Sequence, residues 1–132
     1  MSLLGNINLN LLNKSLDGLW IKQQITMDNI ANYSTPGYKS KYVDFESSLK
    51  DKVSKIISGN KIKEASMTEE INSGDVIIGT NDNQSLRLDG NNVDLEKENL
   101  ELAKTQLQYM YTVSEINSYF SKLKSVISEG KK

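Results

Sequence analysis

The residues best suited to chemistry lie between Asp89 and Glu96, where the sequence reads Asp-Gly-Asn-Asn-Val-Asp-Leu-Glu. Oxygen-bearing side chains at alternating positions are typical of calcium-binding loops. An EF-hand loop also needs an oxygen ligand at its fifth position and glycine at its sixth. This segment has Val93 and Asp94 at those positions. We therefore interpret it as a turn followed by a helix cap, and we predict no metal site.

Paired carboxylates are the other candidates for chemistry, as general acids and bases. Glu69-Glu70 and Glu96 with Glu98 lie among polar residues, a setting typical of solvated surface charge. The sequence contains no histidine and no cysteine, which removes the commonest zinc ligands and the cysteine nucleophile. It has no glycine-rich phosphate loop and no nucleophile elbow. We predict that the protein is not an enzyme and uses no cofactor and no small-molecule substrate.

Composition also limits the partners. The formal net charge is −1 and Arg87 is the only arginine, so nothing favours nucleic acid, which requires a basic face. No apolar run approaches the roughly 20 residues that span a bilayer, and we expect neither a membrane-spanning segment nor a cleavable secretory signal. Apolar residues make up 37% of the 132 residues. One modest core is possible, and we expect the apolar stripes to be buried against partners.

Two long amphipathic helices are predicted to position these residues, one at each end of the chain. The first runs from about Asn8 to Asn32, and the last runs from Leu95 to about Ser128 with Asp94 as its N-cap. Each has a row of residues spaced alternately by three and four, which is the seam of a helix that packs on another helix. The first seam is Leu9, Leu12, Leu16, Leu19, Gln23, Thr26 and Ile30, and the last is Leu102, Gln106, Tyr109, Val113, Ile116, Phe120, Leu123 and Ile127.

The fold predicted from these seams is mainly α, with the terminal helices packing as an antiparallel helical hairpin or coiled coil. Further apolar residues widen the first helix and form a second stripe on the last, so each helix can touch more than one neighbour. Those residues are Trp20, Met27 and Ala31, and Leu100, Ala103, Leu107 and Met110. The predicted chemistry of the chain is therefore association, with itself and with related chains.

A breaker segment, Ala31 to Tyr38, ends the first helix. The residue before Pro36 is disfavoured in the helical region, Gly37 accepts positive φ, and Asn32 can adopt a left-handed capping conformation. A helix stop explains Pro36 and Gly37 but not Tyr38, which we expect to be exposed. It also leaves unexplained the Asp44-Phe45 pair that follows.

Between the terminal helices we predict an irregular middle segment, residues 39–92, while residues 1–38 and 93–132 form one core domain. A short helix runs from Phe45 to Ile56 and closes at Ser58-Gly59-Asn60. Residues 76–78 are predicted to pair with residues 86–88 in a small β-hairpin, because Asn81-Asp82-Asn83 between them has turn chemistry.

Two motifs resemble a known family. Asn29-Ile30-Ala31-Asn32 followed by Thr35-Pro36-Gly37-Tyr38-Lys39 is similar to the N-terminal signature of bacterial flagellar rod, hook and related axial proteins. Asp44-Phe45, the segment 89–98, and Glu101-Leu102-Ala103 with Gln106 and Tyr109 resemble the proximal-rod FlgB family within that group. The chain departs from the pattern at Tyr33-Ser34, where Ala-Asp is commoner, and in its ending Ser-Glu-Gly-Lys-Lys.

The resemblance implies a structural subunit of the basal-body rod, with the breaker segment and Asp44-Phe45 as its assembly motif. It implies export by the flagellar type III apparatus without signal cleavage, to the periplasm or cell-wall zone. The implied partners are the chain itself, other rod proteins, a FliE-type adaptor and the export gate. The terminal helices would form a torque-transmitting tube around the export channel.

From the residues alone an alternative stays open, a soluble coiled-coil adaptor or secretion chaperone. Such a protein would be a stable helical oligomer at micromolar concentration. A rod subunit would stay monomeric until it reaches the growing end of its filament.

Overall fold

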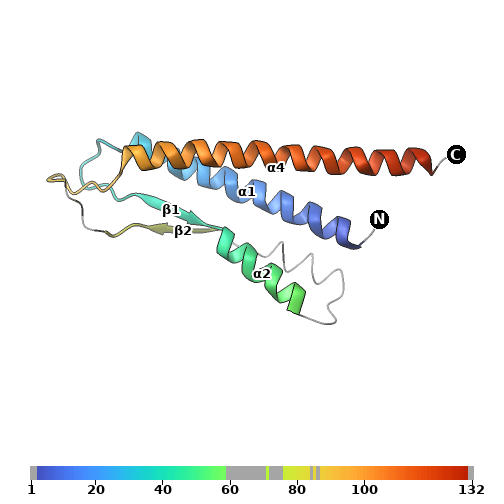
Figure 1. Cartoon of the computed structure of the whole chain (residues 1–132). Helices are drawn as coiled ribbons and strands as arrows, with labels where there is room; N and C mark the ends of the chain where they lie inside the picture. The colour runs from blue at the N-terminus through green and yellow to red at the C-terminus, as the bar shows by residue number, and fades with distance from the viewer. Residues whose placement is uncertain (1–2, 59–70, 72–75, 84, 86, 131–132) are drawn as a thin grey trace.

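The computed structural model describes residues 3–58, 71, 76–83, 85 and 87–130. Two long helices, α1 (Leu3–Ala31) and α4 (Leu95–Glu129), run antiparallel along each other (Figure 1). Between them in the chain come β1 (Lys41–Asp44), α2 (Glu46–Ser58) and β2 (Ile77–Thr80). The antiparallel helical hairpin and the short middle helix are confirmed.

Helix α1 begins at Leu3, five residues before the predicted start, and ends at Ala31. After it the chain passes through turns, with the amide of Tyr33 donating to the carbonyl of Ile30 and that of Thr35 to Asn32. Gly37 has φ +71°, as predicted, but no non-glycine residue among those described has positive φ. The left-handed cap expected at Asn32 is therefore wrong, because turns rather than a left-handed cap follow the helix.

Helix α4 begins and ends close to its predicted positions. The side chain of Asp94 accepts a hydrogen bond from the amide of Lys97, and Glu96 and Glu98 lie in the first turn. Acidic residues there complement the partial positive charge of a helix N-terminus. Local signals were sufficient for this helix.

A two-stranded antiparallel sheet lies in the middle segment, and its pairing differs from the predicted hairpin. Strand β2 pairs with β1, in the register Lys41 to Thr80 through Asp44 to Ile77. The residues predicted as its partner include Leu86, outside the described residues, and Leu88, which lies in an exposed turn. The ring of Tyr42 covers Gly79 in the register Tyr42 to Gly79, where a side chain would clash with it. The sheet therefore joins strands that are far apart in the sequence, rather than two strands of a local hairpin.

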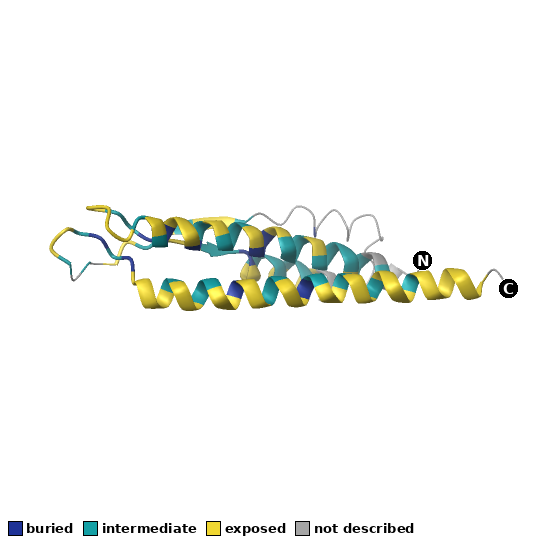
Figure 2. Cartoon of the chain, turned by 90° about the horizontal axis from the view of Figure 1, so that it is seen from above, coloured by how far each residue is buried: buried dark blue, intermediate teal, exposed yellow. Residues whose placement is uncertain are grey.

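The contact between α1 and α4 is formed largely by small and polar residues. Thr105 and Thr112 are the buried residues of α4, and Leu19, Thr26 and Asn29 are buried on α1 (Figure 2). The Thr112 hydroxyl donates to the carbonyl of Gln108 within its own helix. Leu19 is the only large apolar residue in this group.

Phe45 fastens the middle segment to α1. Its side chain is buried, and a Cβ atom added to Gly18 would lie 2.4 Å from two atoms of its ring. Gly18 therefore provides the space that the ring occupies. Beside this contact the ammonium of Lys22 lies 3.6 Å from the carboxylate of Glu46 at the start of α2.

Candidate functional site

The end of α1 is joined to the start of α4 through the buried side chain of Asn29. Its amide nitrogen donates to the carbonyl of Lys41 (2.7 Å) and to the carboxylate of Glu98 (3.1 Å). Its oxygen accepts from the backbone amide of Lys41 (2.9 Å) and from the hydroxyl of Tyr38 (3.2 Å). One side chain therefore holds both long helices and β1 in fixed positions.

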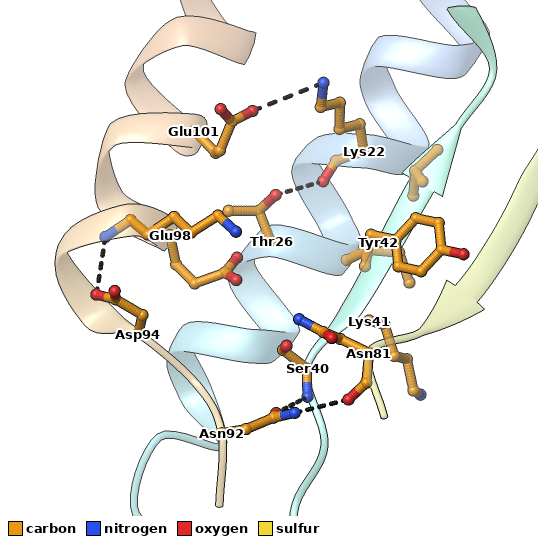
Figure 3. Close-up of a pocket in the computed structure, with 13 residues that line it drawn as sticks. Lys22, Thr26, Ser40, Lys41, Tyr42, Asn81, Asn92, Asp94, Glu98 and Glu101 are labelled. Atoms are coloured by element: carbon orange, nitrogen blue, oxygen red, sulfur yellow. Dashed lines mark hydrogen bonds and ion pairs between the residues drawn. The ribbon is translucent and has the colours of Figure 1, made fainter. Parts of the chain in front are cut away.

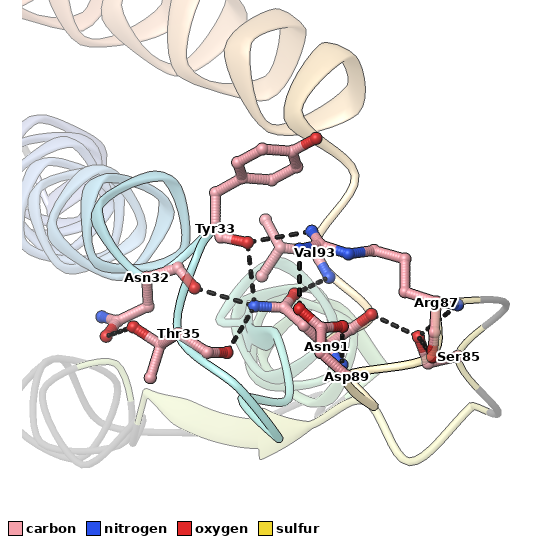
Figure 4. Close-up of polar contacts among 8 residues, drawn as sticks. All are labelled: Asn32, Tyr33, Thr35, Ser85, Arg87, Asp89, Asn91 and Val93. Carbon is pink, nitrogen blue, oxygen red and sulfur yellow. Dashed lines mark hydrogen bonds and ion pairs between the residues drawn. The ribbon is translucent and has the colours of Figure 1, made fainter.

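Asn91 holds the breaker segment to the residues before α4 (Figure 4). It is fully buried, and its amide nitrogen lies 2.8 to 3.0 Å from three carbonyl oxygens, those of Asn32, Tyr33 and Thr35. Its own oxygen accepts from the amide of Val93 at 2.8 Å. An amide group has two hydrogens, so at least one of them is shared between two of these three carbonyls.

A second set of contacts closes the same tip from outside. The guanidinium of Arg87 donates to the carbonyl of Tyr33 (2.9 Å) and to Asp89 (2.8 Å), and it stacks 4.7 Å from the centre of the Tyr33 ring. Ser85 hydrogen-bonds the carbonyl of Asn91, and the amide of Gly37 donates to the carbonyl of Asp89 (2.8 Å). We call this group the tip cluster. Its members are Asn29, Asn32, Tyr33, Thr35, Gly37, Ser85, Arg87, Asp89, Asn91 and Val93.

Asn92 links β1 to the turn after β2. Its oxygen accepts from the amide of Ser40 (2.7 Å), and its nitrogen donates to the carbonyls of Asn81 (2.6 Å) and Asn83 (3.2 Å). Three asparagines, 29, 91 and 92, therefore replace an apolar core at this end of the molecule.

Beside Asn92 lies a polar cavity of about 330 Å³ between α1, β1 and α4 (Figure 3). The ammonium of Lys22 lies 3.7 Å from Glu101 on its wall. Burial raises the pKa of Glu98, and the hydrogen bond from Asn29 opposes that rise. Glu98 was expected among solvated surface charges, but it is half-buried and bonded to Asn29 of α1.

The assembly motif predicted from the sequence is divided between three places. Asn29 and Tyr38 meet through their side chains, and Tyr38 is half-buried rather than exposed as expected, because its hydroxyl reaches Asn29. Burial, with the carboxylates of Asp28 and Glu98, raises the pKa of Tyr38. Asn32 and Thr35 bond each other (3.1 Å).

Of the remaining members of the motif, Gly37 belongs to the tip cluster through its amide, and the others lie apart from it. Ile30 is half-buried, while Ala31, Pro36 and Gly37 are exposed. Asp44 accepts from the amide of Ser47 in the first turn of α2 (3.1 Å), and Phe45 packs at Gly18.

Five residues of these joints were missed by the sequence reading. Asn91, Asn92, Ser85 and Arg87 lie in or next to segments predicted as turns or as a possible strand, and Gly18 lies within the predicted first helix. Asparagine is also a common turn residue, so its type alone does not reveal a tertiary role.

The segment first considered as a calcium loop uses its oxygens within the chain. The carboxylate of Asp89 accepts hydrogen bonds from the guanidinium of Arg87 and from the amide of Asn91 (3.0 Å). The carboxylate of Asp94 caps α4. Among the described residues no three His, Cys, Asp or Glu side chains gather where they could hold a metal ion. The turn and cap account for every one of these contacts.

Most of the predicted seam residues lie beside the buried row rather than in it. On α4, Leu102, Tyr109 and Val113 are half-buried, as are Ile116 and Leu123, while Phe120 is 48% and Ile127 is 56% exposed. On α1, the seam members Leu19 and Thr26 are buried. The half-buried α1 members are Leu9, Leu12, Leu16 and Ile30.

The middle segment covers the opposite flank of the buried row. Helix α2 shares an apolar groove of about 520 Å³ with Ser15 and Leu19 of α1 and with Gln108, Tyr111 and Thr112 of α4. Since one turn takes 3.6 residues, Gln108 and Tyr111 fall on one side of the row formed by Thr105 and Thr112, and the seam falls on its other side. We call the side with the seam the open face of the helix pair.

Comparison with known proteins gives a consistent result. A protein of Bacillus subtilis (strain 168) named flagellar basal body rod protein FlgB is 36% identical over 111 residues, covering 84% of this chain and 85% of the relative. The chain belongs to the FlgB family of flagellar basal body rod proteins.

More distant relatives bear the same name. The FlgB protein of Proteus mirabilis (strain HI4320) is 30% identical, covering 83% of this chain and 85% of its own length, and that of Escherichia coli (strain K12) is 28% identical, with 83% and 84% covered. No family model matches the chain.

The resemblance to the FlgB family inferred from the sequence is therefore confirmed. The chain is a structural subunit of the flagellar basal body rod, the part of the motility apparatus for which its relatives are named. No helix in the described part of the chain is long and apolar enough to cross a membrane.

Proposed function

We propose that the chain is a proximal-rod subunit that assembles with copies of itself and with other rod proteins through its two terminal helices. The observation that carries the proposal is the open face. A helix pair normally buries its most apolar rows in its own contact, yet here Thr105, Gln108 and Thr112 lie nearest α1 and α2 while Phe120 and Ile127 remain about half exposed. Seams left open in the single chain fit contacts between chains.

The tip cluster gives the same subunit a rigid end. Buried amide groups with all their partners fix one geometry, since any change leaves several carbonyls unpaired. In our proposal this fixed end sets the direction in which the breaker segment meets the next subunit, and residues 39–92 lie outside a tube formed by residues 1–38 and 93–132.

The family resemblance extends the proposal to location and partners. The subunit would be exported by the flagellar type III apparatus without cleavage and would lie outside the cytoplasmic membrane. There it would meet a FliE-type adaptor and the export gate on one side and further rod proteins on the other. The tube would conduct exported proteins and transmit torque.

The experiment is to delete the gene in the bacterium that encodes the chain and to isolate basal bodies. We expect non-motile cells whose basal bodies lack the rod, with both restored by the intact gene, and the chain recovered in the restored rods by mass spectrometry. Motile cells with complete rods after deletion would contradict the proposal. A stable oligomer of the purified chain at micromolar concentration, with none in rods, would favour the adaptor or chaperone instead.

A further inference from the structure

An apolar row on the outside of α4 is not used by any contact described so far. Leu100, Leu107 and Met110 are 69%, 68% and 67% exposed, and Ala103 lies between them at the same spacing. At about 100° per residue this row points away from Thr105 and Thr112, so it lies opposite α1. We call these four residues the outer row of α4.

Helix α1 also has exposed apolar residues in a row. Trp20 is 57% and Met27 is 46% exposed, and Ala31 continues the same spacing. We call these three residues the outer row of α1. The two outer rows lie on different sides of the molecule, so one copy cannot join them.

The two outer rows lie at the same height along the helix pair. Asn29 bonds Glu98, and Ser15 and Leu19 share the apolar groove with Gln108 and Thr112. Because the helices run antiparallel, positions equally far from Asn29 on α1 and from Glu98 on α4, counted back along α1 and forward along α4, are level. Met27 is therefore level with Leu100, and Trp20 is level with Leu107.

Charge also matches across the two outer rows. Asp28 is exposed beside Met27, and Lys97 is exposed beside Leu100. When the two helices of different copies lie antiparallel with their rows in contact, the helical repeat puts Asp28 and Lys97 on the same flank of the contact. They are nearly level, since each is the neighbour in sequence of a residue in the Asn29–Glu98 hydrogen bond.

We propose that the outer row of α4 in one copy packs against the outer row of α1 in a second copy of the chain, side by side at the same height. This inference rests on the proposed function, because it names one of the subunit contacts within the rod. The contact joins two different surfaces, so it is heterologous, and each added copy exposes both surfaces again. Such a contact builds a ring or a helical array, whereas a contact between identical surfaces would stop at a dimer.

The test uses the absence of native cysteine from the chain. Cells that express the Trp20→Cys and Leu107→Cys variants together provide basal bodies, which are treated with a short bis-maleimide. We expect cross-linked dimers of the two variants and far fewer with either variant alone, and a ladder of oligomers from the double variant. The matched control is Trp20→Cys with Ser125→Cys, exposed on α4 at another height. A rate no higher than this control, or equal cross-linking of Leu107→Cys with itself, would overturn the contact.

Charge reversal provides an independent readout on the same pair of cysteines. Asp28→Lys or Lys97→Glu alone should slow cross-linking by roughly two- to fivefold, and the two together should restore the rate. Single variants without effect, or a double variant slower than both, would contradict the proposed flank.

The same double-cysteine chain in isolated basal bodies separates this inference from the proposed function. Motile cells whose rods contain the chain but yield no ladder would overturn the contact alone. A ladder from the purified chain, with none of it in rods, would overturn the proposed function alone.

Discussion

Asn29 and Glu98 lie 69 residues apart in the chain and share a hydrogen bond of 3.1 Å that joins the end of α1 to the start of α4. The acceptor is a carboxylate whose pKa is raised by burial, although the bond from Asn29 and the charge of Lys97 lower it. The joint between the two long helices therefore depends on pH.

Replacing Glu98 tests this dependence. The folded state binds the proton of Glu98 more tightly than the unfolded chain does. The contribution of Glu98 to stability therefore falls as pH rises from about the ordinary pKa of 4.5 through the higher folded pKa. Glu98→Gln keeps an oxygen for Asn29 and should remove this fall. Urea unfolding is measured between pH 3.5 and 8, with Glu96→Gln as the control. The free energy of unfolding of Glu98→Gln should increase relative to that of the native chain as pH rises. A constant difference across that range would contradict the assignment.

Asn91→Asp tests the tip cluster with almost no change in shape. A carboxylate cannot donate to the carbonyls of Asn32, Tyr33 and Thr35, and it would bring negative charge against them. We expect a loss of about 2 to 4 kcal/mol in the free energy of unfolding. Asn99→Asp, at an exposed position of α4, is the matched control and should change it by less than about 0.5 kcal/mol. Equal effects at the two positions would show that Asn91 is only a turn residue.

Gly18→Ala should destabilise the chain even though alanine is favoured in helices by about 1 kcal/mol. The new methyl group would lie within 3 Å of three ring atoms of Phe45, and such overpacking costs about 1 to 3 kcal/mol. The double variant with Phe45→Leu should recover part of the loss. Thermal unfolding by circular dichroism measures both, and an additive double variant would mean that the ring does not occupy this space.

These contacts show what the sequence alone could predict. The terminal helices, the cap at Asp94 and the turn at Gly37 follow from neighbouring residues, so they were predictable. The pairing of β2 with β1 was not, because residues 76–78 carry no local signal that selects a strand more than thirty positions away. Asn91 was read as part of a turn for the same reason, since its three acceptors come from another segment.

The seams illustrate a different difficulty. The spacing of apolar residues shows which face of a helix is buried. It does not show whether the same chain or another chain in an assembly buries that face. Val113 and Phe120 marked α4 as amphipathic, but the residues buried on α4 are Thr105 and Thr112. Threonine at helical spacing is a weak signal for packing, because it is equally common at polar positions.

Gly37→Val tests the breaker segment. Gly37 has φ +71° with open space around it, so the cost arises from the backbone alone, about 1 to 2 kcal/mol. Because a β-branched residue would redirect the chain at the tip, we expect loss of rod assembly with the secreted protein still soluble. Tyr38→Ala, which removes the hydroxyl from Asn29, should weaken assembly less.

Electron microscopy of basal bodies would show the effect of both variants, and Ser34→Val in the same segment is the control. Normal rods from both Gly37→Val and Tyr38→Ala would leave residues 32–38 as a simple boundary between helix and strand.

The most direct measurement of the central claim is rod assembly in cells whose only copy carries Phe120→Asp. Phe120 is 48% exposed on the open face, so the single chain should still fold and be exported. In an assembled rod the carboxylate would be buried without a partner, at a cost of several kcal/mol. We predict secreted protein, no rods and no swimming, while Ser125→Asp on the far side of α4 behaves as the native chain. Full-length rods and normal swimming with Phe120→Asp would show that the open face is not an assembly surface.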